Sequence, residues 1–190
     1  TENGFRMRYG RTEVWSQIQS LLADAGAVKV ATNSMALVIN DRTDLPVAEL
    51  PFPRDITYVG NNLLKQTAHV GTGVLALRIR PEPIPWARGV HKIIGYPAYT
   101  VPVASTIAPL QEKAREKEFY FASAAFAVQM APGDLVVIGP DKYTGERQTL
   151  GGLFFCKPEG TLFFNPNKRT PPQIKPAVRL YVLICTAIND

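Results

Sequence analysis

An apolar stretch spanning residues 119–139 dominates the hydrophobic pattern, and Ala131-Pro132-Gly133-Asp134 divides it in two. Proline suits the second position of a type II turn, and glycine suits the third, which requires a positive φ. The flanking residues are aromatic, β-branched or small, which predicts two buried strands. Residues 119–130 are apolar or small on both faces, which is typical of a central strand. We therefore expect a hairpin here that forms the core of the domain.

Two clear periodicities mark the N-terminal region. Residues 5–9 alternate between apolar side chains and arginines, which predicts a half-buried strand. Apolar residues then recur at helical spacing from Val14 to Ala25, and Thr12 and Gly26 stand where a cap and a terminating glycine belong. Trp15 lies on the apolar stripe of this helix, so we expect it to be buried against the sheet.

The region after this helix predicts two further strands, at 28–31 and 35–40, around a turn. The resulting β-α-β-β order is compatible with a small subdomain over residues 1–45. Small ring-forming domains of bacterial secretion channels have a similar element order, which is an analogy of order alone. Otherwise we expect one domain over residues 1–190, because nothing in the sequence is typical of a linker.

The middle of the chain is interrupted by prolines. Residues 41–62 predict an extended loop with a strand at 56–59, followed by a short helix from Asn61 to Ala68. Residues 70–80 alternate, so Leu75, Leu77 and Ile79 should face inward while Arg78 and Arg80 face outward. The three prolines in 81–90 exclude a central strand there. Short strands are expected at 93–94 and 99–103, separated by Gly95 and Pro97.

The last third mixes one helix with further strands. Residues from Ser105 or Thr106 to Glu118 predict a helix with Pro109 in its first turn; an alternative extends this helix through 130. After a polar loop at 141–148, a second hairpin is expected from 153–156 and 161–164. Residues 165–176 form a basic, proline-rich loop that contains no acid. Residues 178–188 predict a final strand that is apolar on both faces.

Composition limits the class of protein. The chain has 190 residues, 46% hydrophobic, and a net charge of +5, so it can bury a core and is too apolar for a disordered chain. The longest apolar run near its end, at 180–185, is far shorter than the about 20 residues of a membrane helix, and the first residues do not resemble a signal peptide. We expect a soluble or peripheral protein.

The sequence lacks the common motifs of catalytic and metal-binding sites. No Gly-x-Ser-x-Gly occurs, and Cys156 and Cys185 stand in apolar runs without a histidine beside them. They should be buried free thiols, although one disulfide is possible if their strands are neighbours. The two histidines, His69 and His91, lack metal-ligand spacing. Glycines that precede strands do not form a phosphate loop. We expect no cofactor and no metal.

Two basic groups are the candidate contacts for nucleic acid, another polyanion or a protein partner, because cations interleaved with aromatic residues can hold a phosphate backbone and stack bases. Trp86, Tyr96 and Tyr99 lie near the first group. The predicted contact residues of the first group are Arg78, Arg80, Arg88, His91 and Lys92, and those of the second group are Lys168 and Arg169.

These patterns predict a mostly β fold, a β-sandwich or jelly-roll-like barrel with two or three short helices, and α+β as the alternative. The final segment AVRLYVLICTAIND resembles the closing strand of jelly-roll virus coat subunits. This resemblance covers less than about a tenth of the chain and implies a capsid-like architecture.

Three classes of function remain. The first is a non-enzymatic structural protein that self-associates, most concretely a jelly-roll capsid subunit, and proline-rich extended segments suit it. The second is a polyanion- or partner-binding module of a bacterial envelope or secretion ring assembly. The third is an enzyme with residues dispersed on loops, for which Asp141, Glu146 and His91 would have to converge. We expect a homo-oligomer; its location is left open, with a virion and a bacterial periplasm as the candidates.

Overall fold

The computed structural model describes residues 2–27, 31–101, 107–142, 149–163 and 173–188, and most of its elements are strands. The strands are β1 (Phe5–Arg11), β2 (Thr43–Leu50), β3 (Arg54–Val59), β4 (Lys65–Val70), β5 (Gly73–Pro83), β6 (His91–Thr100), β7 (Phe119–Tyr120), β8 (Phe126–Met130), β9 (Asp134–Pro140), β10 (Cys156–Phe163), β11 (Gln173–Val178) and β12 (Tyr181–Ile184). The helices are α1 (Trp15–Asp24), α2 (Ala108–Arg115) and α3 (Leu150–Phe155), with short 3-10 segments η1 (Thr12–Val14) and η2 (Ala122–Ala124). The prediction of a mostly β fold with a few helices is confirmed.

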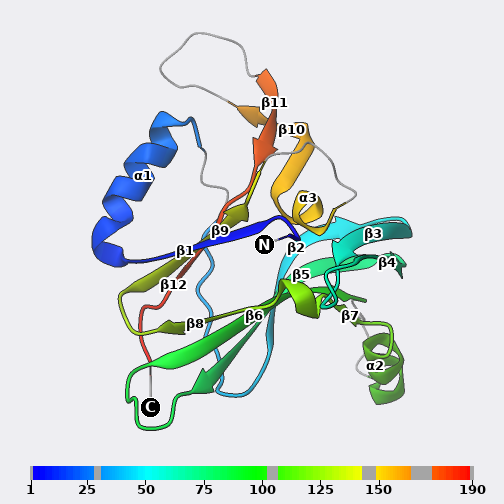
Figure 1. Ribbon diagram of the computed structural model, residues 1–190, viewed down its shortest axis with the longest axis horizontal. Helices are drawn as coiled ribbons and strands as arrows, with labels where there is room; N and C mark the ends of the chain where they lie inside the picture. The colour runs from blue at the N-terminus through cyan, green and yellow to red at the C-terminus, as the bar shows by residue number, and fades with distance from the viewer. Residues whose placement is uncertain (1, 28–30, 102–106, 143–148, 164–172, 189–190) are drawn as a thin grey trace.

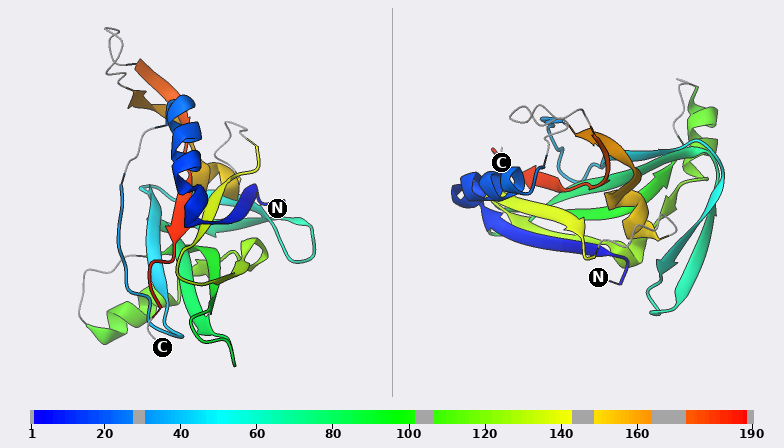
Figure 2. Two further views of the ribbon diagram at one scale, coloured as in Figure 1. Left: turned by 90° about the vertical axis from the view of Figure 1, so that its left-hand side faces the viewer. Right: turned by 90° about the horizontal axis from the view of Figure 1, so that it is seen from above.

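The described strands form four antiparallel sheets (Figures 1 and 2). One sheet has the order β1-β9-β12, and a larger one has the order β2-β5-β6-β7, with β8 also paired to β6. The pairs β3-β4 and β10-β11 are separate two-stranded sheets. Strands from both larger sheets, together with α3 and the β3-β4 pair, bury their side chains in one hydrophobic cluster.

The turn at 131–134 is as predicted, but its two strands do not form a hairpin. The Asp134 N–H donates to the Ala131 carbonyl at 3.0 Å, and Gly133 has φ +89°, as a type II turn requires. However, β8 pairs with β6, while both edges of β9 are taken by β1 and β12. The turn therefore carries the chain from one sheet to the other.

The predicted central strand at 119–130 is divided into β7, η2 and β8, and both strands line one edge of β6. The predicted covering of both faces is wrong for β8, because Phe126 and Met130 are buried whereas Ala127 and Gln129 are exposed. The break lies opposite Pro97, whose carbonyl accepts from the Phe121 N–H at 3.1 Å. The helical alternative is also wrong, because α2 ends at Arg115.

Strand β6 is continuous, although two short strands were predicted there. Along β6, the residues up to Gly95 pair with β8 and the residues from Ala98 pair with β7, and Pro97 lies between these two pairings. The missing N–H of Pro97 faces this gap, so β6 keeps its pairing with β5.

Two segments that were predicted as a loop and as a helix belong to the antiparallel sheets instead. The predicted loop contains β2, which tolerates Pro46 because it is an edge strand with a register shift between Pro46 and Ala48. The predicted helix from Asn61 is the turn of the β3-β4 hairpin, in which Leu63 has φ +61°. Pro81 and Pro83 extend β5 beyond the end of β2, where no partner on that side needs their N–H.

Helix α1 is confirmed, with its predicted glycine. Gly26 has φ +75°, its N–H donates to the Ala23 carbonyl, and the Ala27 N–H donates to the Leu22 carbonyl, which is a Schellman ending. The predicted burial of Trp15 is wrong, because α1 has no buried residue and Trp15 is half-buried. The predicted strand at 35–40 is also wrong, and 28–30 lie outside the described residues, so the β-α-β-β order is not found where the chain is described.

The predicted strand at 153–156 is mostly helix α3, because the Thr149 side chain accepts from the Gly152 N–H and caps it, while every residue of this helix is buried. Residues 178–188 hold the last residue of β11 and then β12, rather than one continuous strand. The β10-β11 hairpin projects away from the rest of the molecule in Figures 1 and 2. We call this hairpin the arm.

Candidate functional site

Three of the predicted cations lie on one face of the larger sheet. Arg78 and Arg80 alternate along β5, and Lys92 of β6 stands opposite Glu82, two residues beyond Arg80. Glu82 lies 2.5 Å from Arg80 and 3.7 Å from Lys92. This carboxylate therefore offsets part of the positive charge of the predicted basic face, although Arg80 and Lys92 keep nearly half of their side chains exposed.

The other predicted contact residues are not part of this face. His91 is buried and stands opposite Pro83, so it belongs to the opposite face of the sheet. Arg88 is exposed in the β5-β6 connection. Lys168 and Arg169 lie outside the described residues. Of the five contact residues that the structure describes, only Arg78, Arg80 and Lys92 share a face, and the binding of a polyanion or partner by the predicted residues stays a prediction.

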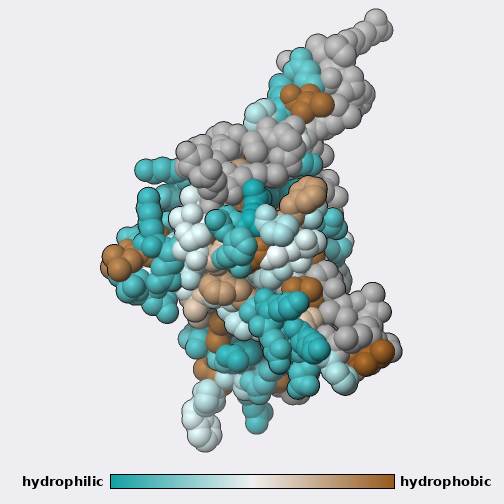
Figure 3. Space-filling model, turned by 90° about the vertical axis from the view of Figure 1, so that its right-hand side faces the viewer, coloured by the Kyte–Doolittle hydropathy of each residue, from teal (hydrophilic) through white to brown (hydrophobic). Residues whose placement is uncertain are grey.

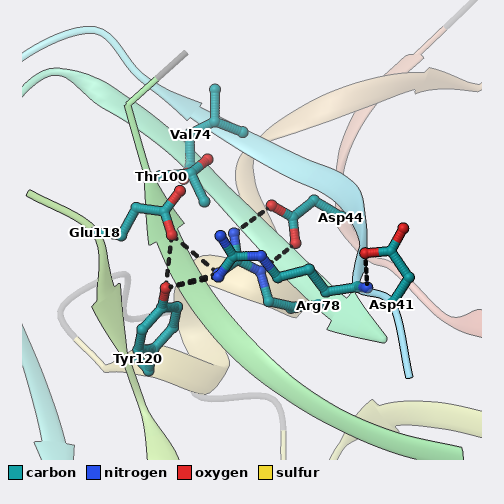
Figure 4. Close-up of polar contacts among 8 residues, drawn as sticks. Asp41, Asp44, Val74, Arg78, Thr100, Glu118 and Tyr120 are labelled. Atoms are coloured by element: carbon teal, nitrogen blue, oxygen red, sulfur yellow. Dashed lines mark hydrogen bonds and ion pairs between the residues drawn. The ribbon is translucent and has the colours of Figure 1, made fainter. Parts of the chain in front are cut away.

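Arg78 is buried, with 2% of its side chain exposed, so the expectation that it faces solvent is wrong. Alternation along β5 places it on the opposite face from Leu77. Figure 4 shows Asp44, Glu118 and Tyr120 around its guanidinium on that face. Its guanidinium donates to Asp44 of β2 at 2.6 Å, to Glu118 at 2.9 Å and to the Tyr120 hydroxyl at 2.8 Å. The guanidinium carbon also lies 5.0 Å from the centre of the Tyr120 ring.

The charges of this cluster reinforce one another. Hydrogen bonds to Asp44 raise the pKa of Arg78, so it is always protonated. Burial alone would raise the pKa of Glu118, but hydrogen bonds from Arg78 and Tyr120 outweigh it and hold the pKa below its usual range. Burial, and then the bond to Glu118, raises the pKa of Tyr120. A cation neutralised by two carboxylates has little capacity left for an anionic ligand, so this cluster joins β2, β5 and β7 structurally.

A groove of about 490 Å³ runs between β1 and the start of β8. Its walls are apolar except for two arginines of β1, Arg6 and Arg8, and Asp141. The lining residues are Phe5, Arg6, Met7, Arg8, Ala124, Ala125, Phe126, Ala127 and Asp141. Arg6 contacts Asp141 at 2.9 Å, whereas Arg8 has no acidic partner in the part of the chain that the structure describes.

Large apolar side chains are exposed on three protrusions. Ile174 on the arm is 70% exposed, Leu63 at the β3-β4 turn is 73% exposed, and Trp86 at the β5-β6 turn is fully exposed. Figure 3 shows hydrophobic surface on the projecting arm. The sequence pattern places Trp86 only near the basic residues. Its exposed place in a turn, at a position where glycine is normally favoured, is seen only in the structure.

The enzyme reading finds no support in the described residues. Asp141 is paired with Arg6, His91 does not line the groove, and Glu146 lies outside the described residues. The described residues include no group of three or more side chains that could hold a metal ion. Both cysteines are free thiols; Cys156 is buried as predicted, whereas Cys185 is only half-buried.

Comparisons with protein-family models, with curated proteins and with solved structures found no match for this chain. Among the described residues, no helix is long and apolar enough to span a membrane.

Proposed function

We propose that this chain is a structural subunit that assembles with copies of itself and has no enzymatic activity. The most concrete form of this proposal is a coat, or capsid, subunit with a jelly-roll-like arrangement of its two larger sheets. The shared hydrophobic cluster of these sheets, and the turn at 131–134 that passes from one to the other, support such an arrangement.

The observation that carries the proposal is the arm. It is a two-stranded sheet, and such a sheet is marginally stable in water unless a third strand or another element packs against it. Within β11, the four residues Gln173 to Pro176 are all exposed, and Val178 is 44% exposed. The arm therefore presents apolar side chains and an unpaired strand edge where the described chain offers no cover, as expected of a segment that packs on a neighbouring copy.

The test uses a matched pair of substitutions. Ile174→Asp places a charge on the arm, and Leu63→Asp makes the same change at an equally exposed position on the β3-β4 turn. Size-exclusion chromatography with light scattering should show an oligomer for the natural chain and for Leu63→Asp, and a smaller species for Ile174→Asp. Thermal unfolding of dilute protein should barely change for either variant, because both side chains are exposed.

A natural chain that stays monomeric at every concentration would refute the proposal. An oligomer that tolerates Ile174→Asp would instead remove the arm as its support.

A further inference from the structure

The tip of the β5-β6 hairpin contains two consecutive turns. The Ala87 N–H donates to the Ile84 carbonyl at 3.1 Å, and the Val90 N–H donates to the Ala87 carbonyl at 3.4 Å. The third residue of each turn has φ +69°; it is Gly89 in the second turn and Trp86 in the first. Glycine adopts this conformation freely, whereas a bulky side chain is strained in it.

Among the described residues, no packing compensates this strain, because Trp86 is 102% exposed. Pro85 before it is also exposed. A residue that costs the fold stability and returns no contact to it points to a contact outside the chain. Tryptophan is also the residue type most enriched among the dominant contacts of protein interfaces.

The groove between β1 and β8 has the chemistry that an indole requires. Met7 and Phe126 are among its lining residues, beside charged ones, and its volume of about 490 Å³ exceeds that of a tryptophan side chain. Arg8 lines it and has no acidic partner among the described residues, so its guanidinium is available to lie over an aromatic face. An indole can use both the apolar lining residues and the guanidinium of Arg8 in this groove.

We propose that Trp86 of one copy inserts into the groove between β1 and β8 of a second copy; this inference rests on the self-association proposed above. The tip and the groove are different surfaces, so the contact is head-to-tail. Such contacts continue from copy to copy and generate rings, shells or filaments, rather than stopping at a two-fold dimer.

The experiment blocks each side of the contact separately. Trp86→Gly removes the indole and places glycine at the positive φ, so the melting temperature of dilute protein should stay the same or rise, while the oligomer becomes smaller because only the arm contact remains. Ala127→Trp fills the groove from an exposed position on β8 and should reduce the oligomer to the same size. Leu63→Asp, at the exposed β3-β4 turn, is the control and should leave assembly unchanged.

Mixing the two blocked variants provides the decisive measurement. Trp86→Gly retains a groove and Ala127→Trp retains a tip. When both variants also carry Ile174→Asp, which removes the arm contact, an equimolar mixture should form dimers that cannot grow, as measured by light scattering. A contact between identical surfaces would not be restored by mixing.

Three results would overturn the inference in distinguishable ways. If the natural chain never assembles, the proposed function fails together with it. If the natural chain assembles and Trp86→Gly assembles equally well, only this inference fails. If Arg88→Ser, and not Trp86→Gly, weakens retention of the protein on heparin with a steep dependence on salt, the tip binds a polyanion instead.

Discussion

Arg78 shows how one residue can follow the pattern of its strand and still have an unexpected environment. Its side chain points away from Leu77, as alternation along β5 requires, yet it is buried because Asp44, Glu118 and Tyr120 cover that face. Removing one member of a buried ion pair leaves an uncompensated charge, which costs more than losing an exposed pair. The cluster thus adds a side-chain link through one guanidinium to the backbone pairing that holds edge strand β2 and β7 in the sheet.

Substitution of Arg78 should therefore destabilise the fold strongly. We expect Arg78→Ala to lower the free energy of unfolding by about 3–5 kcal/mol, measured by chemical denaturation. Arg80→Ala, two residues further along the same face of β5, removes an exposed contact with Glu82 and should cost about 0–1 kcal/mol. Equal costs for the two variants would show that the Arg78 cluster does not stabilise the fold.

Glu118 should make stability depend on acidic pH. Its pKa is held below the usual range in the folded state, so the stability it contributes is fully present above its pKa in the unfolded chain. That contribution is lost as the pH falls through the lower, folded-state pKa. The free energy of unfolding should therefore fall on acidification, and less steeply in Glu118→Gln. An unchanged acid dependence in this variant would contradict the prediction.

At the scale of elements, α1 shows that a sequence pattern can predict a helix without predicting whether its apolar stripe is buried. Its apolar spacing and its glycine ending follow from the sequence alone, but the spacing does not say which surface the stripe faces. Leu21 is 70% exposed, and α1 has no buried residue. The stripe of α1 is therefore a second apolar surface that the described chain leaves largely open.

Trp15 should consequently contribute less to stability than its size indicates. We expect Trp15→Ala to cost less than about 1.5 kcal/mol, below the about 3–5 kcal/mol of a core aromatic residue. Phe121→Ala provides the comparison, because Phe121 is fully buried and should show the larger cost. Chemical denaturation of dilute protein measures both. A Trp15 cost as large as that of Phe121 would show that α1 is anchored to the body of the protein.

Local signals and long-range pairing differ in how well the sequence predicts them. The turn at 131–134 and the end of α1 at Gly26 depend on residues within a few positions, and both were predicted. The pairing of β8 with β6 depends on which edges β9 leaves free, and the burial of Arg78 depends on acids 34 and 40 residues away. The exposure of Trp86 and its positive φ also depend on the folded hairpin, and no pattern in the sequence states either of them.

At the scale of the whole molecule, the arm and the tip of β5-β6 project, whereas β9 lies at the centre of its sheet. Assembly should therefore change the stability of the molecule unevenly. Binding of a second copy to the folded state raises the free energy of opening for the segments that it covers and makes stability depend on concentration. Strand β9 has partners on both sides within the chain, so it gains little from a neighbour.

Amide hydrogen exchange at two protein concentrations, below and above the onset of assembly, should reveal this difference. In dilute protein the amides of β11 should exchange quickly, because the arm has only two strands and its residues are exposed. In concentrated protein their exchange should slow at least several-fold, whereas the amides of β9 should be protected equally in both. The Ile174→Asp variant should keep fast exchange in β11 at either concentration. Protection of β11 that is independent of concentration, in a chain shown to assemble, would place the contact between copies elsewhere.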